Sequence, residues 1–165
     1  MPKKDWEKFH SYTPERLSTA RLVLEEIRQG AQVMRAIQNH PLPGGGHLAK
    51  HMLVACYRDL VERGEWQHDP ALLARIRMKP MRSLSGVTTV TVLTRPNPCP
   101  GECIFCPDDI RMPKSYLPDE PAAARALQNK FDPFVQVRSR LDSLQAVGHP
   151  IDKVELLILG GTWNA

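Results

Sequence analysis

The sequence predicts an α/β protein in which a small helical domain precedes one βαβ unit of a parallel sheet. In the first half, apolar residues recur at every third or fourth position, which is the period of an amphipathic helix. In the second half, a β-branched run at residues 87–94 and an apolar run at residues 153–159 have the composition of strands. Helical segments lie between these runs, and the order strand, helix, strand is typical of a parallel sheet.

Three helices are expected in the first half. The first begins at Pro14, after a hydroxyl cap, and ends at the Pro- and Gly-rich run of residues 39–46. A second covers residues 47–63, and a short third follows Asp69 and Pro70. The apolar positions of these helices are Leu24, Ile27, Ala31, Met34, Ile37, Leu53, Tyr57, Leu60, Val61, Leu72, Leu73 and Ile76.

The predicted strand at residues 87–94 leads into a long loop rich in Pro and Gly. Two helical pieces then begin at Pro121 and Pro133, and the second ends at Gly148. The last run, residues 153–159, is mostly apolar, as expected of a buried parallel strand. The second helical piece carries one apolar face, formed by Phe134, Val137, Leu141 and Leu144.

The composition is that of a soluble globular protein. Of the 165 residues, 42% are hydrophobic and 24% are charged, which excludes wholesale disorder. No stretch approaches the roughly 18 uninterrupted apolar residues of a membrane span, and no apolar region follows the charged N-terminus as in a secretory signal. Four cysteines without such a signal favour a reducing compartment, so we expect a cytoplasmic protein with no membrane partner.

The positive charge is concentrated in the first half of the chain. Residues 1–82 hold 14 Lys and Arg against 9 Asp and Glu, whereas residues 83–165 hold 8 against 9. A basic half is compatible with a polyanionic partner such as RNA. A solvated surface gives the same pattern, so charge alone does not decide between the two.

Three cysteines lie close together in the loop after the first predicted strand. Cys99, Cys103 and Cys106 have the spacing C-x3-C-x2-C, and thiolates are the ligands that iron–sulfur clusters use. Three thiolates leave one iron of a [4Fe–4S] cluster open, so that the methionine end of S-adenosylmethionine can chelate it. Electron transfer from the cluster could then cleave a C–S bond and release a 5′-deoxyadenosyl radical.

Zinc is an alternative occupant of the cysteine cluster. A closed structural zinc site needs a fourth ligand, which Cys56, His47 or His51 could supply. Paired C-x2-C spacing, the usual sign of zinc, is absent. The expected role of Cys56 is that of a small buried hydrophobic side chain, since it lies among apolar helix residues.

The segments around the cysteines are more specific than the spacing itself. They are Lys79-Pro80-Met81-Arg82-Ser83-Leu84-Ser85-Gly86-Val87, Thr94-Arg95-Pro96, Met112-Pro113-Lys114-Ser115-Tyr116, Glu120-Pro121, Phe131-Asp132-Pro133-Phe134-Val135-Gln136-Val137-Arg138, Gly148-His149-Pro150 and Leu159-Gly160-Gly161-Thr162-Trp163. With these segments the chain resembles a family of radical S-adenosylmethionine enzymes, the catalytic subunit of Elongator in its prokaryotic single-protein form. The resemblance covers residues 79–165, and residues 14–78 fit it more loosely.

The resemblance implies a tRNA-modifying enzyme that builds 5-carboxymethyluridine at the wobble position. Its cofactors would be a [4Fe–4S] cluster, which an external electron donor reduces, S-adenosylmethionine and acetyl-CoA. In this family acetyl-CoA binds to a C-terminal acetyltransferase domain that the chain lacks, so we expect a fragment that is inactive alone. The resemblance leaves the oligomeric state open and assigns no catalytic residue.

The resemblance also implies a domain organisation. Residues 1–78 would form a basic, helical, tRNA-binding domain, and residues 79–165 would begin the radical S-adenosylmethionine domain. That part would be the first βαβ unit of a partial TIM-like barrel, truncated after its second strand, because the full (β/α)8 form needs about 200 residues or more.

Particular residues are assigned by their match to the family. Cys99, Cys103 and Cys106 would ligate the cluster, and the segment Gly160, Gly161 and Thr162 would contact the methionine part of S-adenosylmethionine. Two further groups are read from their position in the chain: Lys114 and Tyr116, which could shape the cofactor pocket or serve as ordinary loop residues, and Arg75, Arg77, Lys79 and Arg82, which could contact RNA.

Two other functions remain open from the residues alone. In the first, the chain is a non-catalytic RNA-binding module whose cysteines hold a structural zinc. In the second, it belongs to another radical S-adenosylmethionine enzyme that modifies RNA, a methyltransferase or a methylthiotransferase. The family-specific segments around the cysteines disfavour the second.

Overall fold

The computed structural model describes residues 12–101, 103–107 and 109–161. The chain divides into two compact units, one formed by Met1–Met81 with Ala146–His149 and the other by Arg82–Gln145 with Pro150–Ala165. In the described part of the chain, no helix is long and apolar enough to cross a membrane.

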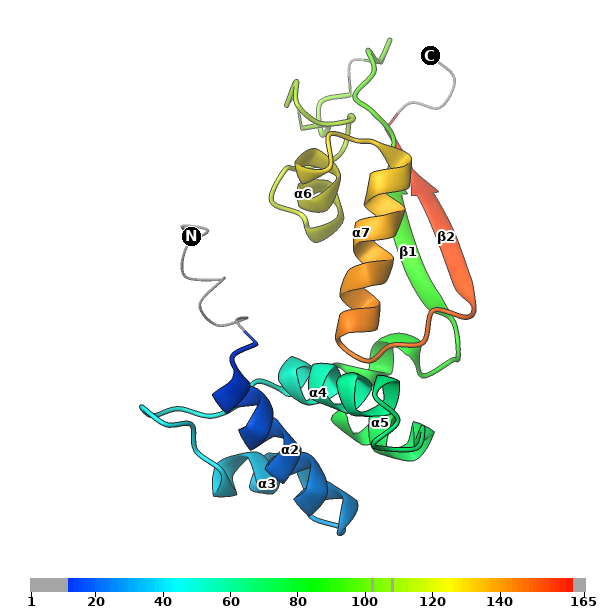
Figure 1. Cartoon of the computed structure of the whole chain (residues 1–165). Coiled ribbons are helices and arrows are strands. Elements are labelled where there is room, and N and C mark those ends of the chain that lie inside the picture. Colours follow the sequence, from blue (N-terminus) through cyan, green and yellow to red (C-terminus); the bar gives the residue numbers. More distant parts are fainter. Residues whose placement is uncertain (1–11, 102, 108, 162–165) are drawn as a thin grey trace. The chain divides into compact units, whose positions relative to one another are not determined.

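The first unit is a small helical bundle (Figure 1). Helix α2 packs against α3 and α4, and α4 also packs against α5. Apolar side chains from all four helices form one core, in which Leu24, Leu53 and Tyr57 are almost completely buried. The bounds of the helices are α2 (Pro14–Arg28), α3 (Val33–Asn39), α4 (Lys50–Glu62) and α5 (Pro70–Ile76).

Two of these helices begin at the caps that the sequence predicts. The Thr13 side chain accepts a hydrogen bond from the Arg16 N–H at 3.4 Å. The Asp69 carboxylate accepts hydrogen bonds from the Ala71 and Leu72 N–H groups, each at 3.0 Å. In both helices Pro occupies the first turn, where its missing N–H has no partner to lose.

The prediction of one continuous helix from Pro14 to the loop at residues 39–46 is wrong. The helix ends at Arg28, and Gly30 adopts a φ of 106° that an L-amino acid rarely reaches. The Gly30 N–H then donates to the Ile27 carbonyl, as is usual at a helix C-terminus. The apolar residues keep their three- to four-residue spacing across this break, so the spacing does not reveal it. Met34, which lies beyond the break, is 59% exposed.

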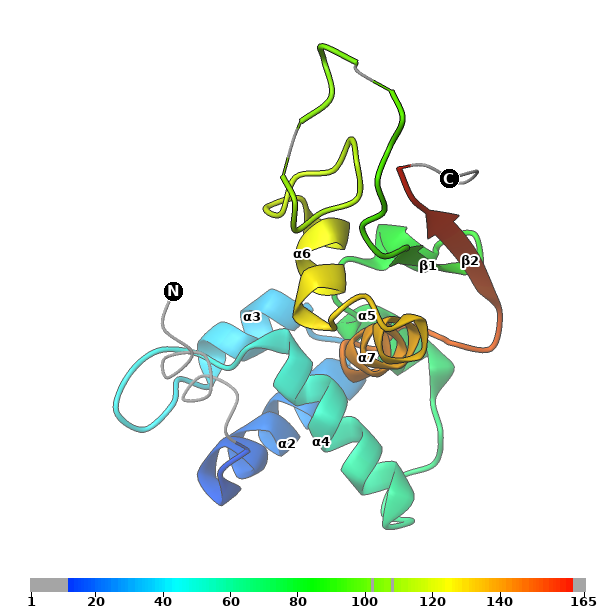
Figure 2. The same ribbon diagram turned by 90° about the horizontal axis from the view of Figure 1, so that it is seen from above.

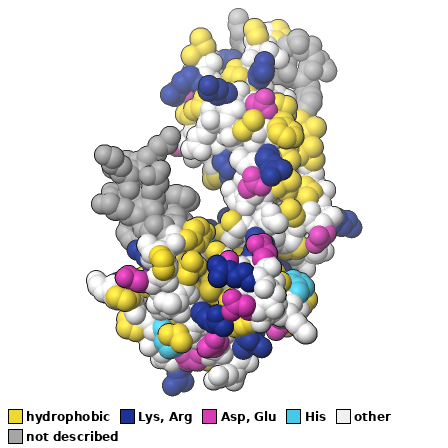
Figure 3. Space-filling view, viewed as in Figure 1, with side chains coloured by type: hydrophobic (Ala, Val, Ile, Leu, Met, Phe, Trp, Pro, Cys, Tyr) yellow, Lys and Arg dark blue, Asp and Glu magenta, His cyan; other side chains and the backbone are white. Residues whose placement is uncertain are grey.

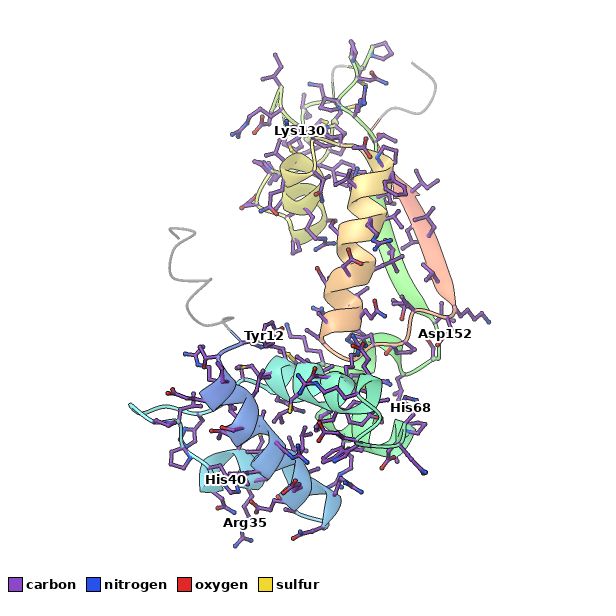
Figure 4. All side chains as sticks on the ribbon, in the orientation of Figure 1. Tyr12, Arg35, His40, His68, Lys130 and Asp152 are labelled. Carbon is purple, nitrogen blue, oxygen red and sulfur yellow. The ribbon has the colours of Figure 1, made fainter. Side chains whose placement is uncertain are left out.

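Helix α3 is held against α2 by polar contacts to one carboxylate. Asn39 donates to the Glu26 carboxylate at 2.8 Å, and the His40 Nε2 lies 2.9 Å from its other oxygen (Figure 4 labels His40).

The second unit contains a parallel two-stranded sheet. Strand β1 (Thr88–Leu93) pairs with β2 (Val154–Leu159) in a register that runs from Thr88 opposite Val154 to Leu93 opposite Leu159. Two helices, α6 (Pro121–Gln128) and α7 (Pro133–Ala146), lie between the strands in the sequence, and a short 3-10 helix, η1 (Pro80–Ser83), precedes β1. The predicted α/β architecture and the parallel pairing are therefore confirmed.

Helix α7 lies along β1, as both ribbon views show (Figures 1 and 2). Its contact with the strand includes a buried amide: the Gln136 Oε1 accepts from the Leu93 N–H, and the Gln136 Nε2 donates to the Leu93 carbonyl, both at 3.0 Å. The apolar face predicted for this helix is only partly used, because Leu144 is buried whereas Phe134 is 75% exposed.

Strand β2 is exposed along its whole length, contrary to the prediction of a buried strand. Its apolar side chains remain between 37% and 52% exposed. Figure 3 shows hydrophobic surface, in yellow, along the edge of the unit where β2 lies in Figure 1. In the described chain β2 pairs only with β1, so its other edge has no neighbouring strand.

A long loop joins β1 to α6 beyond the carboxyl end of the sheet. Figure 2 shows it leaving β1 in an arch and returning to α6. Its return is anchored by Met112, which is buried with Leu93, Ala126 and Phe131 in the core of this unit. Phe131 reaches that core through a tight turn, in which it and Lys130 (labelled in Figure 4) have φ values of 57° and 52°.

Candidate functional site

The three clustered cysteines lie in the loop that follows β1, at the carboxyl end of the strand. Cys99 and Cys106 are half-buried and Cys103 is exposed. A hydrogen bond from the Cys106 N–H to the Cys103 carbonyl, at 3.1 Å, closes a turn around the second and third cysteines. The carboxyl ends of parallel strands are where α/β proteins place ligands.

Gly101 leaves open the space that two of the sulfur atoms face. A Cβ built on Gly101 would lie 3.6 Å from the Cys99 Sγ and 3.7 Å from the Cys103 Sγ. Both sulfurs therefore point toward the same region of the loop, and a larger residue at position 101 would extend into it.

The donor set is compatible with an iron–sulfur cluster. Three thiols within eight residues can each bind a different iron of a [4Fe–4S] cube, so their sulfurs do not have to converge on one point. Within the described ranges, no three His, Cys, Asp or Glu side chains are grouped as ligands of a single metal ion.

The glycines after β2 lie very close to residues at the two ends of the cysteine loop. A Cβ on Gly160 would collide with the Thr94 side chain at the end of β1. A Cβ on Gly161 would lie 2.6 Å from the Lys114 carbonyl oxygen and 2.8 Å from the Lys114 nitrogen. Only glycine permits these approaches, which bring Gly161 next to Lys114, another predicted site residue, and Gly160 next to Thr94. Thr162, predicted as the third member of this segment, lies outside the described residues.

The segment around Lys114 connects the glycines to the cysteines. Lys114 is half-buried, and Tyr116 packs against the core of this unit. Between them, the Ser115 Oγ lies 3.5 Å from the Cys106 Sγ. The sequence motif contains Ser115, but nothing in the pattern of residue types indicates this contact.

A compact ion pair shapes the loop between Cys106 and Lys114. The Asp109 carboxylate accepts hydrogen bonds from the Arg111 side chain at 2.9 and 2.6 Å and from the Arg111 N–H at 2.9 Å. These hydrogen bonds lower the pKa of Asp109 to about 2, so the carboxylate is charged at neutral pH.

The four residues predicted to contact RNA are divided between the two units. In the first unit the Arg75 guanidinium donates to the Ile27 and Ala31 carbonyls at 2.8 and 2.6 Å, and the Arg77 Nε donates to the Gly148 carbonyl at 2.9 Å. These two side chains therefore have structural partners, whereas Lys79 is exposed.

In the second unit the exposed Arg82 is close to two other arginines. Burial is the main cause that lowers the pKa of both Arg125 and Arg140, and the positive charge of Arg82 adds to the effect on each. The three cations therefore form a basic group on η1, α6 and α7.

Cys56 is a buried structural residue, as predicted. It is 4% exposed, and its Sγ lies 3.6 Å from the Leu17 carbonyl oxygen. Burial raises the pKa of its thiol to about 11, which disfavours the thiolate that a metal ion requires. Of the histidines named as zinc ligands, His47 is exposed and His51 packs edge-on against the Tyr12 ring.

Comparison with known proteins places the chain among relatives of tRNA-modifying transferases. It is 48% identical over 100 residues to the tRNA uridine(34) acetyltransferase of Methanocaldococcus infernus, which is 57% of this chain and 19% of that protein. It is also 51% identical over 82 residues to the protein of the same name from Dehalococcoides mccartyi. These residues are 50% of this chain and 18% of that protein.

The second group of relatives is Elongator complex protein 3. The human protein is 34% identical over 118 residues, which is 65% of this chain and 22% of that protein. The resemblance to the catalytic subunit of Elongator is therefore confirmed, although the chain matches only 18–22% of the length of these relatives. No protein-family model matches the chain.

Proposed function

We propose that the chain contributes the first part of a radical S-adenosylmethionine domain to an enzyme that modifies the wobble uridine of tRNA. The observation that carries the proposal is the approach of Gly161 to Lys114, which joins the end of β2 to the cysteine loop. The relatives named tRNA uridine(34) acetyltransferase support the choice of substrate.

In this proposal Cys99, Cys103 and Cys106 hold a [4Fe–4S] cluster and leave its fourth iron to S-adenosylmethionine. When bound, the cluster would transfer one electron from an external donor to S-adenosylmethionine and break its C5′–S bond, which yields methionine and an organic radical. Gly101 keeps the region between two of the sulfurs open for the cluster.

The glycine segment would bind the methionine part of S-adenosylmethionine. Gly160 and Gly161 carry no side chain, so an ammonium group can approach the backbone carbonyls of this segment. Lys114 lies against Gly161, and we propose that it and Tyr116 border the same pocket. Thr162 remains a predicted member of it.

The remaining steps require parts of the relatives that this chain does not match. Acetyl-CoA would supply the carbon that is added to C5 of the uridine, and exposed cations such as Lys79 and Arg82 would contact tRNA phosphates. Because the matches cover 18–22% of the relatives, we expect the chain alone to form no carboxymethyluridine.

Anaerobic reconstitution of the full chain with iron and sulfide tests the proposal. We expect iron and sulfide to be bound in equal amounts, with charge-transfer absorption at the blue edge of the visible spectrum. Binding of one zinc and no iron would contradict it and favour a structural zinc site.

Substitution of the cysteines locates the cluster. Cys99→Ala, Cys103→Ala and Cys106→Ala should each lose iron with unchanged helix content by circular dichroism. The matched control is Cys56→Ala, which should keep its iron because Cys56 is buried in the helical core. Global unfolding of the three loop variants would instead indicate a structural zinc site.

A further inference from the structure

Ser115 is in contact with one of the three clustered cysteines. Its Oγ lies 3.5 Å from the Cys106 Sγ, within hydrogen-bonding distance for sulfur, and either atom can donate when the cysteine is a thiol. Once the cysteine is a metal-bound thiolate, its sulfur has no proton to give, and only the serine hydroxyl can donate.

The backbone at Ser115 is unusual for a serine. The Tyr116 N–H donates to the Pro113 carbonyl at 3.2 Å, so Ser115 is the third residue of a tight turn. Its φ is 77°, in the left-handed region where such a turn normally has Gly or Asn. Serine keeps this conformation only where the surrounding structure holds it.

Neighbouring contacts fix this turn from both sides. On one side Gly161 lies against the Lys114 backbone, and on the other Tyr116 packs onto the core that contains Met112. The turn therefore directs the Ser115 hydroxyl toward Cys106.

We propose that Ser115 is a positioning residue that donates a hydrogen bond to the Cys106 thiolate and thereby raises the reduction potential of the cluster. This inference rests on the proposed function. Reduction adds negative charge to a cluster, and a hydrogen bond to a ligand sulfur stabilises that charge. Removal of the hydroxyl therefore lowers the potential.

Two variants separate the hydroxyl from the backbone strain. Ser115→Gly removes the hydroxyl and suits the positive φ, whereas Ser115→Ala removes the hydroxyl and keeps the strain. The full chain is reconstituted with iron and sulfide, without S-adenosylmethionine, and its midpoint potential is measured by redox titration with electron paramagnetic resonance. Both variants should shift to a more negative potential by the same amount. Ser143→Ala, on the exposed side of α7, is the control and should keep the potential of the unaltered chain.

The outcomes distinguish the two proposals. If the unaltered chain assembles the cluster and both variants keep its potential, the Ser115 proposal is wrong and the proposed function stands. A shift in Ser115→Gly but not in Ser115→Ala assigns the effect to relief of backbone strain and also overturns it. If the unaltered chain takes up no iron, the proposed function fails and the Ser115 proposal fails with it.

Discussion

At the scale of single residues, the glycines that follow β2 impose the strictest steric requirement in the second unit. The atoms that a Cβ on Gly161 would meet are backbone atoms of Lys114, which cannot move aside as the end of a side chain can. Gly101 differs, because the atoms nearest to its Cβ would be two sulfurs at ordinary contact distance. The two positions therefore form a matched pair for substitution.

We predict that Gly161→Ala destabilises the second unit by about 1–3 kcal/mol, the usual cost of forcing extra atoms into a packed site. Gly101→Ala should leave the free energy of unfolding nearly unchanged. Urea denaturation of the two variants checks this difference, and equal stabilities would show that Lys114 and Gly161 are not in close contact.

The Asp109–Arg111 pair makes the stability of its loop depend on pH. Its hydrogen bonds lower the pKa of Asp109 from 3.8 to about 2, so the folded state favours the charged carboxylate. The resulting stability is fully present above the unfolded pKa and is lost as the pH falls through the folded pKa near 2.

We predict that Arg111→Gln raises the pKa of Asp109 toward its ordinary value, because the charged hydrogen-bond donor is gone. Titration of the Asp109 carboxyl carbon by nuclear magnetic resonance measures this. Arg95→Gln, an exposed cation in the same loop, should not change it. A pKa that stays near 2 in Arg111→Gln would contradict the assignment.

At the scale of elements, α7 and β1 are joined by the Gln136 amide. The backbone groups of β1 alternate in direction. The N–H groups of Thr88 and Thr94 point toward β2 and donate to the Lys153 and Leu159 carbonyls. The N–H and C=O of Leu93 point away from β2. Gln136 satisfies both groups of Leu93 and is itself only 4% exposed. A helix side chain thus takes the place of a neighbouring strand at this point.

We predict that Gln136→Leu destabilises the second unit by about 2–4 kcal/mol, because it leaves a buried N–H and a buried C=O without partners. Gln145→Leu, on the exposed part of the same helix, should change the stability by less than about 0.5 kcal/mol. Thermal unfolding compares them, and a similar small effect at both positions would rule out a structural role for the Gln136 hydrogen bonds.

At the scale of the whole molecule, local signals predict more of the structure than long-range ones. The starts of α2, α5, α6 and α7 follow from Pro in the first turn, and those of α2, α5 and α7 also from a capping side chain. Both signals act within a few residues. The break at Gly30 is missed because the apolar period continues through it. The burial of Gln136 and the exposure of Phe134 depend on partners far away in the sequence, which periodicity does not contain.

The candidate site divides in the same way. The cysteine spacing and the paired glycines are local, so the sequence alone identifies them. The contact between Cys106 and Ser115 depends on a turn with positive φ, and serine is not a residue type that predicts such a turn. The approach of Gly161 to Lys114 depends on the pairing of β1 with β2.

The exposed strand β2 has a consequence for the behaviour of the chain in solution. Among the residues that the structure describes, one edge of β2 has no partner strand, and an apolar edge of this kind is a template for pairing with a second copy. We predict that the chain associates as its concentration rises, and that Ile158→Lys weakens this association about tenfold, as loss of roughly 1.5 kcal/mol of apolar burial requires. Ile158 and Leu22 are each 52% exposed, but only Ile158 lies on β2. In sedimentation velocity experiments, Ile158→Lys should therefore associate more weakly than the unaltered chain, and Leu22→Lys should associate as the unaltered chain does. Equal weakening in both variants would show that β2 is not the surface of association.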